Sequence, residues 1–323
     1  MSNIYQINNL QGLSFLIQVP VPLLKEHIRY PHYREFTIPK KTGGNRRIMA
    51  PANGLKYIQS KLAYEFQKKY RAPDFVFGFV KNQNGVEKSI RENALKHVGK
   101  KYVWNIDIKD FFGSISTQKI KDVLMLEPFQ MKEQLAIDLA LLLCYQRQLP
   151  AGAPSSPILS NIVCRKMDID LTEFILNQGS DFDFSRYADD LTISSNKEIT
   201  ESFQKQIFKI LKQNGFVINK KKNRIYTEHQ SQWVTGIKVN TVLNLDRRYI
   251  KNIRAILHDI ESRGINKALT KMNQKNLQIY TIKSFMNHLK GRINHIGFVK
   301  GKEDSSFKNL MNRLESIQSN LKA

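Results

Sequence analysis

The feature that most constrains this chain is a pair of adjacent aspartates between two strand-like runs. Asp189 and Asp190 lie between residues 184–187 and 191–194, which are rich in aromatic and β-branched residues. The pattern predicts a β-hairpin with both carboxylates at its bend. Adjacent like charges repel, and a divalent cation bound by their oxygens would remove that repulsion. Turn chemistry alone also explains acidic residues between strands, so a metal site requires a third carboxylate.

A third carboxylate occurs upstream, near the end of another strand-like run. Residues 102–108 are mostly apolar, and Asp107 stands where an apolar residue would otherwise be expected. If this strand pairs beside the hairpin, Asp107 and Asp189 face the same point. Two metal ions held about 4 Å apart can activate an attacking hydroxyl and stabilise a leaving pyrophosphate. Asp110 precedes two phenylalanines and is instead predicted to cap the following segment.

Three motifs, which occur in the order typical of the family, resemble those of reverse transcriptases, and two further stretches resemble the bacterial retron branch. The motifs shared with reverse transcriptases in general are Asp107-x-x-x-Phe111-Phe112, residues 149–157 (Leu-Pro-Ala-Gly-Ala-Pro-Ser-Ser-Pro) and Tyr187-Ala188-Asp189-Asp190. The motifs of the retron branch are Asn93-Ala94-Leu95-Lys96-His97 and Val234-Thr235-Gly236. The resemblance covers roughly residues 30–240, and the ordered set is far more specific than any one motif.

The resemblance implies an α+β, right-hand polymerase fold. It has fingers, a ferredoxin-like palm with helices on one face of an antiparallel sheet, and a helical thumb. The expected domains are an N-terminal extension (1–30), fingers and palm (31–240) and thumb (241–323). The order of strand-like and helical runs agrees with a βαββαβ palm. The sequence further predicts strands over residues 75–80, 216–218 and 233–239 and a helix from Pro157 to about Leu176. The predicted helix caps are Asn53, Ser116 or Thr117, Thr200 and Asp246.

The resemblance also implies the residues of the active site. The expected metal ligands, for two Mg²⁺ ions with Mn²⁺ as an alternative, are Asp107, Asp189, Asp190 and the backbone carbonyl of Ile108. The expected nucleotide-binding residues are Arg46, Arg47, Phe112, Ala151, Gly152 and Lys222. Many reverse transcriptases carry Gln where this chain has Ala151, which puts its nucleotide affinity or fidelity in doubt.

Plainer explanations remain for several of these residues. The basic hairpin around Arg46 is equally typical of a solvated surface, and Phe112 is equally typical of an ordinary core residue rather than a steric gate beneath the sugar. Lys222 belongs to a lysine run of a kind that usually lies on a solvated face.

A further set is expected to bind nucleic acid. It comprises Asn93, His97, Trp233, Val234, Thr235, Gly236, Arg247, Arg248, Lys251 and Arg254. Physical chemistry alone favours a core histidine at position 97, and Trp233 suits a half-buried core position as well as base stacking. The basic helical segment after Asp246 resembles a thumb that contacts an RNA–DNA hybrid by shape and backbone, although a generic helical domain fits it too.

The net charge and the distribution of apolar residues restrict the kinds of partner that this chain is expected to bind. The chain has 51 Lys and Arg against 28 Asp and Glu, a net charge of +23, which indicates a polyanionic partner and salt-sensitive binding. Only two cysteines occur, and both are predicted to be free thiols in a reducing cytosol. No apolar run approaches 18 residues and no signal peptide is evident, so a cytoplasmic protein without membrane contact is expected.

The resemblance implies RNA-directed DNA synthesis from dNTPs. For a retron enzyme it further implies a structured noncoding RNA as template and primer, with an internal 2′-hydroxyl as the priming group. The product is branched RNA-linked DNA (msDNA), and a separately encoded effector or toxin protein acts with the enzyme in anti-phage defence. Two alternatives stay open. One is a reverse transcriptase of an abortive-infection or diversity-generating lineage, and the other is a nucleic-acid-binding scaffold that restrains an effector.

Overall fold

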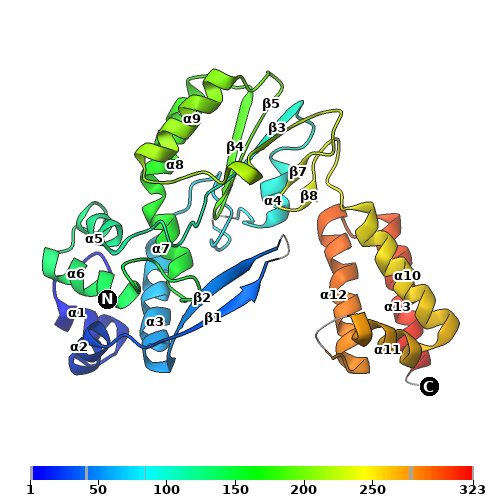
Figure 1. The fold of residues 1–323 in the computed structure, drawn as a ribbon, viewed down its shortest axis with the longest axis horizontal. Helices are drawn as coiled ribbons and strands as arrows, with labels where there is room; N and C mark the ends of the chain where they lie inside the picture. Colours follow the sequence, from blue (N-terminus) through cyan, green and yellow to red (C-terminus); the bar gives the residue numbers. More distant parts are fainter. Residues whose placement is uncertain (1–2, 41–42, 84, 276–278, 322–323) are drawn as a thin grey trace. The chain divides into compact units, whose positions relative to one another are not determined.

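The structure, a computed structural model, describes residues 3–40, 43–83, 85–275 and 279–321 (Figure 1). Contacts between residues divide the chain into two units. The first combines Met1–Ser89 with Trp104–Ile225, and the second combines Ile90–Val103 with Tyr226–Ala323. This division does not test the predicted boundaries of extension, fingers, palm and thumb, which stay predictions.

The first unit is built around a four-stranded sheet. Its strands are β3 (Tyr102–Asp107), β4 (Phe182–Tyr187), β5 (Asp190–Ser195) and β6 (Arg224–Thr227). They lie in the order β4-β5-β3-β6, and β4 and β5 form the predicted antiparallel hairpin. With helices between β3 and β4 and between β5 and β6, this order is that of a ferredoxin-like βαββαβ palm. The predicted α+β class is confirmed.

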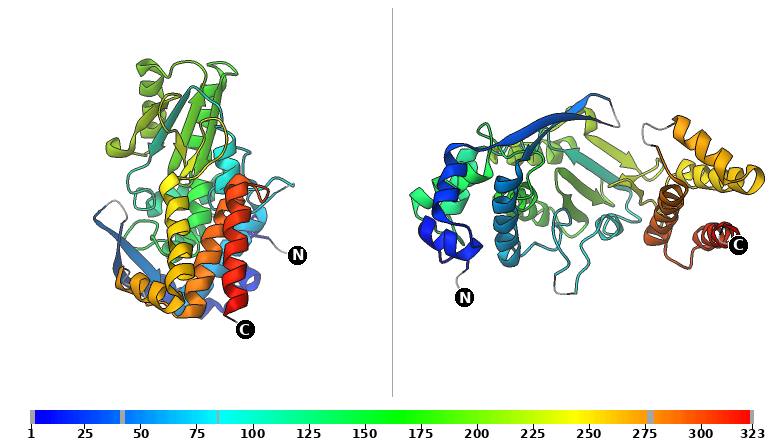
Figure 2. Two further views of the ribbon diagram at one scale, coloured as in Figure 1. Left: turned by 90° about the vertical axis from the view of Figure 1, so that its right-hand side faces the viewer. Right: turned by 90° about the horizontal axis from the view of Figure 1, so that it is seen from below.

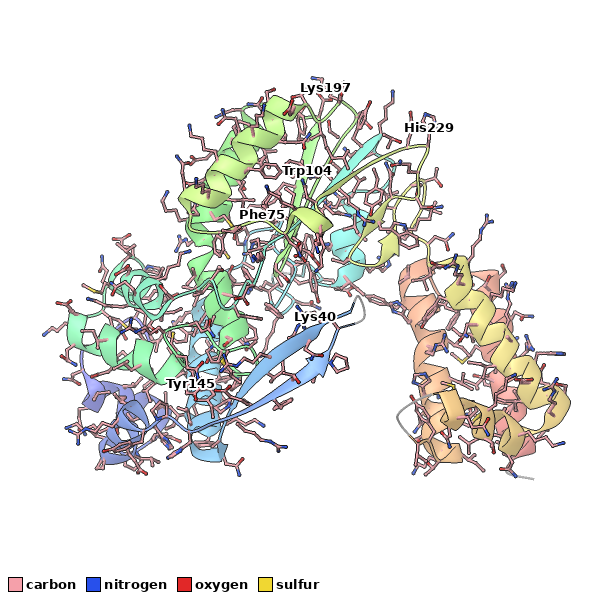
Figure 3. All side chains as sticks on the ribbon, viewed as in Figure 1. Lys40, Phe75, Trp104, Tyr145, Lys197 and His229 are labelled. Atoms are coloured by element: carbon pink, nitrogen blue, oxygen red, sulfur yellow. The ribbon has the colours of Figure 1, made fainter. Side chains whose placement is uncertain are left out.

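Aromatic side chains join the sheet to its covering helices. The ring of Trp104, a fully buried residue of β3 labelled in Figure 3, packs against Phe203 and Phe208 of α9 (Glu201–Gln213). Phe182 of β4 stacks on Phe203 with 4.7 Å between ring centroids. The helix α8 (Arg165–Leu176) packs beside α9 and against β4. These contacts hold the strands that carry the aspartates.

The rest of the first unit consists of helices and one basic hairpin. Its elements are α1 (Leu10–Ile17), α2 (Val21–Arg29), β1 (Tyr33–Pro39), β2 (Asn45–Pro51), α3 (Asn53–Lys69), α5 (Thr117–Met125), α6 (Glu133–Leu143), α7 (Ser156–Val163) and the 3₁₀ turn η1 (Lys220–Lys222). Two predicted helix caps are confirmed. The hydroxyl oxygens of Ser116 and Thr200 accept hydrogen bonds from backbone N–H groups in the first turns of α5 and α9.

The second unit is mainly a helical bundle. Its elements are α4 (Ile90–Leu95), β7 (Trp233–Val234), β8 (Ile237–Lys238), α10 (Arg247–Arg263), α11 (Ile265–Lys275), α12 (Ile282–Lys300) and α13 (Ser305–Asn320). The helices α10, α12 and α13 lie side by side in Figure 2 and bury a common apolar core that includes Leu257, Ile293 and Leu314. Asp246 caps α10 as predicted. No helix in the described part of the chain is long and apolar enough to cross a membrane.

Several predicted elements were wrong in extent. The helix expected from Pro157 to Leu176 is two helices, because a tight turn at Cys164, whose N–H contacts both Ser160 and Ile162 carbonyls, separates α7 from α8. Ala52, not Asn53, occupies the cap position of α3. The helix α11 was not predicted.

Three strand predictions also differ from the structure. The run 233–239 is not one strand, because Thr235 and Gly236 have φ of +46° and +82° and form a turn between β7 and β8. The runs 75–80 and 216–218 are not strands. Each makes one isolated bridge, Val76 with Arg186 and Ile218 with Ile108.

Candidate active site

Two segments far apart in the sequence bring three aspartates, Asp107 from one and Asp189 and Asp190 from the other, to one end of the palm sheet. Asp107 is the last residue of β3, and Asp189 lies in the two-residue loop that joins β4 to β5. The backbone N–H of Ile108 donates a hydrogen bond of 3.0 Å to the carbonyl oxygen of Asp189. The first residue of the hairpin loop, Ala188, has a φ of +59°, where glycine is the usual residue.

The pKa values of the hairpin carboxyls reflect this crowding. Burial raises the pKa of Asp189, the negative charge of Asp107 raises it further, and the positive charges of Lys222 and Arg46 oppose the increase. Asp190 has an exposed surface, yet enough protein surrounds its carboxyl group for desolvation to act. This desolvation, with the charges of Asp189 and Asp107, raises the pKa of Asp190 to about 6. The three carboxylates therefore interact electrostatically.

Asp107 is held by two nitrogen donors. Lys222 Nζ lies 2.5 Å from Asp107 Oδ1, and Asn219 Nδ2 donates to Oδ2 at 3.0 Å. The hydrogen bond with Asp107 raises the pKa of Lys222. Asn219 was not predicted as a site residue, although its Gly215-x-x-x-Asn219-x-x-Lys222 spacing resembles one found in reverse transcriptases.

The donor set suits a hard divalent cation. Carboxylate oxygens are the ligands that Mg²⁺ prefers. Burial, followed by the charges of neighbouring carboxylates, raises the pKa values of Asp189 and Asp190, and a bound cation would oppose both effects. Among the described residues, no group of three or more His, Cys, Asp or Glu side chains is arranged to hold a metal ion. Because both oxygens of Asp107 accept hydrogen bonds, a cation would compete with Lys222 for this carboxylate.

The structure distinguishes the two arginines of the basic hairpin. Arg47 donates to Glu35 Oε2 from Nε at 2.9 Å and to Gln146 Oε1 from Nη2 at 3.0 Å. Arg46 forms no ion pair among the residues described, and its charge lowers the pKa of Asp189. Neighbouring residues of a strand point to opposite faces. Arg46 is therefore the better candidate for contact with a nucleotide at the aspartates.

The remaining predicted nucleotide residues lie in the same unit. Phe112 is half-buried, with its ring 6.0 Å from that of Phe79, so part of it stays accessible. The carbonyl of Ala151 accepts a hydrogen bond of 2.8 Å from the N–H of Met49 in β2. Gly152 has a φ of +127°, and a Cβ there would lie 2.8 Å from Ile48 Cγ2. Close packing of this loop against β2 thus requires glycine at position 152.

Comparison with known proteins decides the family. Residues 38–239 match the family "Reverse transcriptase (RNA-dependent DNA polymerase)". The retron Ec86 reverse transcriptase of Escherichia coli is 33% identical over 261 residues, which cover 79% of this chain and 78% of that protein. The chain belongs to the retron reverse transcriptases. This reverse transcriptase is accordingly an RNA-directed DNA polymerase.

Other relatives agree with this assignment. The retron Ec73 reverse transcriptase of Escherichia coli is 33% identical over 72% of this chain and 77% of that protein. The retron Mx65 reverse transcriptase of Myxococcus xanthus is 31% identical over 72% of this chain and 57% of that protein. Among solved structures, a telomerase from Candida albicans aligns with 90% of this chain and 64% of that chain, at 13% identity and a TM-score of 0.48. That likeness is too low to support an argument about this enzyme.

The two retron motifs of this reverse transcriptase meet in its second unit. Asn93 Nδ2 lies 3.4 Å from the hydroxyl of Thr235, which donates to the carbonyl of Ile90 at 3.3 Å. Asn93 and His97 are 1% and 0% exposed, and Val234 is also buried. Burial lowers the pKa of His97 to about 3, so the imidazole is neutral. Asn93 and His97 could touch nucleic acid only after exposure, whereas Gly236 is exposed and Trp233 half-buried.

Basic side chains follow the outer surface of α10 in the reverse transcriptase. The four predicted nucleic-acid contacts on this helix, Arg247, Arg248, Lys251 and Arg254, are all exposed. None of them forms an ion pair with an acidic side chain in the described part of the chain. Their charges are therefore available to phosphate groups.

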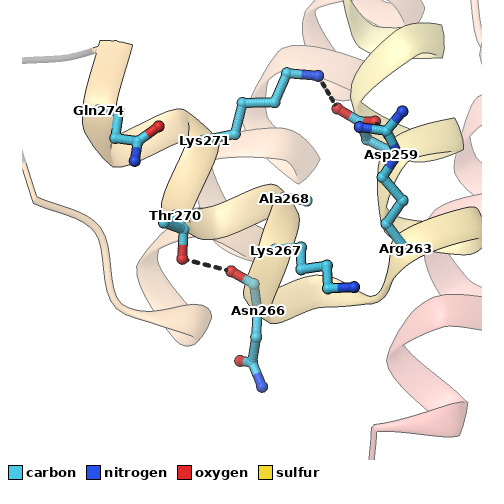
Figure 4. Close-up of a pocket in the computed structure, with 8 residues that line it drawn as sticks. All are labelled: Asp259, Arg263, Asn266, Lys267, Ala268, Thr270, Lys271 and Gln274. Carbon is cyan, nitrogen blue, oxygen red and sulfur yellow. Dashed lines mark hydrogen bonds and ion pairs between the residues drawn. The ribbon is translucent and has the colours of Figure 1, made fainter.

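A shallow pocket of about 360 Å³ lies between the end of α10 and α11 (Figure 4). Arg263, Lys267 and Lys271 line it, and Asp259 is paired with Lys271. With one carboxylate among three cations, the pocket extends the positive charge of α10.

Proposed function

We propose that this enzyme copies a structured noncoding RNA, made from its own locus, into DNA that stays attached to the RNA. Synthesis starts from an internal 2′-hydroxyl of that RNA, and the product is msDNA. The meeting of Asp107, Asp189 and Asp190 at one sheet end carries the polymerase part of the proposal. The identity to retron enzymes supports the noncoding RNA and the branched product.

The reaction is an in-line displacement at phosphorus. The hydroxyl oxygen of the primer forms a bond to the α-phosphorus of a dNTP, and the bond to the pyrophosphate oxygen breaks. The three aspartates, with the Ile108 carbonyl, would hold two Mg²⁺ ions, which lower the pKa of the attacking hydroxyl and neutralise phosphate charge when bound. Mn²⁺ is the alternative ion.

Other side chains position the nucleotide and discriminate between deoxynucleotides and ribonucleotides. Arg46 supplies positive charge to the triphosphate, and Lys222 does the same once Asp107 binds a cation. The accessible part of the Phe112 ring excludes a ribose 2′-hydroxyl and so favours deoxynucleotides. The free cations of α10 and the β7–β8 turn contact the RNA and its hybrid by backbone and shape.

In the cytoplasm, the enzyme and its msDNA act with a separately encoded effector protein in defence against phage. This part of the proposal rests on the retron relatives. If the noncoding RNA or the branch is absent, a reverse transcriptase of an abortive-infection or diversity-generating lineage is the alternative.

The experiment is to purify the enzyme from cells that carry its locus, treat the bound nucleic acid with RNase, and sequence DNA that retains a covalently linked nucleotide. We expect one DNA species joined through a 2′–5′ linkage. Recovery of DNA with no RNA linkage would contradict the proposal.

Asp189→Asn separates catalysis from binding. The variant should lose msDNA synthesis by at least about 1,000-fold, because a two-ion site cannot tolerate loss of a shared ligand, while RNA affinity changes little. Asp122→Asn, at an exposed position on α5, is the matched control. Full phage protection by Asp189→Asn would favour the scaffold alternative.

A further inference from the structure

A buried ion pair lies directly behind the catalytic hairpin. Arg186, in β4, donates to both oxygens of Asp168, in α8, from Nε at 2.7 Å and from Nη2 at 2.6 Å. The side chains of Arg186 and Asp168 are 0% and 1% exposed. Although desolvation opposes its charge, the adjacent carboxylate raises the pKa of Arg186, so the guanidinium stays charged. Neither residue was predicted as part of the site.

All three guanidinium nitrogens of Arg186 donate hydrogen bonds. Its Nη1 donates to Asn161 Oδ1 at 2.8 Å and lies 3.4 Å from the carbonyl oxygen of Ala188 in the hairpin loop. Asn161 Nδ2 in turn donates to the carbonyl of Gly78 at 2.9 Å. One side chain thus connects α8, α7 and the loop that carries Asp189.

Gly78 closes this arrangement against the hairpin. A Cβ at Gly78 would lie 2.4 Å from the backbone nitrogen of Ala188, a distance that side chains do not tolerate. The segment before it is fixed to β4, because Arg186 N–H donates to the Phe75 carbonyl and Phe77 N–H donates to the Arg186 carbonyl. Segment 75–78 therefore packs directly against the hairpin loop, and this contact limits movement of the turn.

The net electrostatic free energy of such a buried ion pair is too small to make stabilisation of the fold its main role. Desolvation of two charges offsets most of their attraction, and apolar residues of similar volume are often as stabilising or more so. The pair instead lies where a non-glycine residue, Ala188, has a φ of +59°. Unusual backbone conformations of this kind persist only when their surroundings over-determine them.

We propose that Arg186, Asp168 and Asn161 are positioning residues for catalysis. Through Ala188 and Gly78 they fix the turn, and so set where the carboxylates of Asp189 and Asp190 lie relative to Asp107. A misplacement of about 1 Å in such a site reduces the rate by roughly 100-fold. Arg46 and Phe112, the residues that we propose to contact the nucleotide, are outside this set of contacts. Loss of the arrangement should therefore lower kcat and weaken metal use, with little change in the KM for dNTP.

The test uses the full-length enzyme on poly(rA)·oligo(dT) with dTTP, so it depends on polymerase activity and not on the identity of the noncoding RNA. The first variant, Arg186→Met with Asp168→Leu, removes both charges together. We expect a Tm close to that of the wild type, kcat reduced by at least about 10-fold, a higher Mg²⁺ concentration for half-maximal rate, and KM within about 3-fold, in line with the positioning role. Wild-type kcat and Mg²⁺ dependence in a folded double variant would overturn the proposal.

A second variant decides the matter if the double variant does not fold. Asn161→Ala keeps the ion pair but cuts its connection to Gly78. It should show the same fall in kcat and the same higher Mg²⁺ requirement, to a smaller extent, and unchanged values would overturn the proposal. The control is Arg313→Met with Glu261→Leu, which removes an ion pair of the second unit. Equal kinetic effects in this control would show a general loss of stability, which also contradicts positioning.

Discussion

At the scale of single residues, charge balance decides how the catalytic end of the palm behaves. Asp107 is neutralised by Lys222, whereas Asp189 and Asp190 carry raised pKa values. A carboxyl whose pKa is higher in the folded state than in the unfolded state favours folding when protonated and opposes it when ionised. The ionised site therefore carries a free-energy cost, from burial of the carboxylates and from their mutual repulsion, that a bound cation can relieve.

Asp190→Asn should stabilise the enzyme when metal ions are removed with EDTA. The pKa of Asp190 is about 6 against an ordinary 3.8, so the gain is present above pH 6 and disappears as the pH falls toward 4. Solvent screens this group, so we expect a gain of order 1 kcal/mol at pH 7.5. Thermal unfolding at pH 7.5 and 4.5 measures it, with Asp122→Asn as control. Equal Tm values for wild type and variant at pH 7.5 would refute the prediction.

His97 should make stability fall in mild acid. Its pKa is about 3 in the folded enzyme against an ordinary 6.5, so the unfolded chain binds a proton that the folded one does not. This contribution is fully present above pH 6.5 and is lost as the pH falls from there toward 3. When the pH is lowered from 7.5 to 5, the free energy of unfolding should fall by about 2 kcal/mol less in His97→Gln than in the wild type. Urea unfolding at both pH values gives the difference, and parallel losses would show that His97 is not the group responsible.

At the scale of elements, patterns within one segment were sufficient for much of the fold. Runs of aromatic and β-branched residues on both sides of the aspartates predicted the β4–β5 hairpin. The predicted caps Ser116 (with Thr117 as the alternative), Thr200 and Asp246 placed the starts of three helices correctly. The strand predicted over residues 75–80 was wrong. Its apolar residues are buried against the hairpin, but the segment makes only one isolated bridge and no continuous set of strand hydrogen bonds. Asp168 and Arg186 could not be paired from the sequence, since each resembles a surface charge until two elements bring them together.

The packing of α12 gives a matched pair of glycine predictions. A Cβ at Gly297 would lie 2.7 Å from the ring of Phe307 in α13, whereas one at Gly291 would meet nothing within 4 Å. Gly297→Ala should lower the stability of the second unit by about 1–3 kcal/mol through overpacking. Gly291→Ala should raise it by about 0.5–1 kcal/mol through helix propensity. Thermal unfolding of the two variants tests the packing, and a shift of the same sign in both would contradict it.

At the scale of the whole molecule, the net charge of +23 dominates the interaction of the enzyme with other charged molecules. A chain with this excess attracts any polyanion, and specificity must come from shape and from local contacts. Arg247, Arg248, Lys251 and Arg254 of α10 form no ion pair among the described residues, whereas other cations of the second unit, such as Arg313 and Lys308, are paired with glutamates.

Glutamine substitution of Arg247, Arg248, Lys251 and Arg254 should weaken RNA binding and flatten its salt dependence. Each lost phosphate contact should reduce the slope of log affinity against log salt by about 0.7 to 0.9. Filter binding between 50 and 300 mM KCl would measure the slope. Substitution of the paired Lys308 and Arg313 is the control, and an equal change there would show that net charge alone matters.

Cys144 and Cys164 are both buried, and burial raises the pKa of each thiol to about 12. Because the thiolate is the reactive form, neither sulfur should react with maleimides while the enzyme is folded. The chain has only these two cysteines. A single cysteine introduced on the surface would therefore accept a fluorescent dye selectively, without prior removal of the native pair.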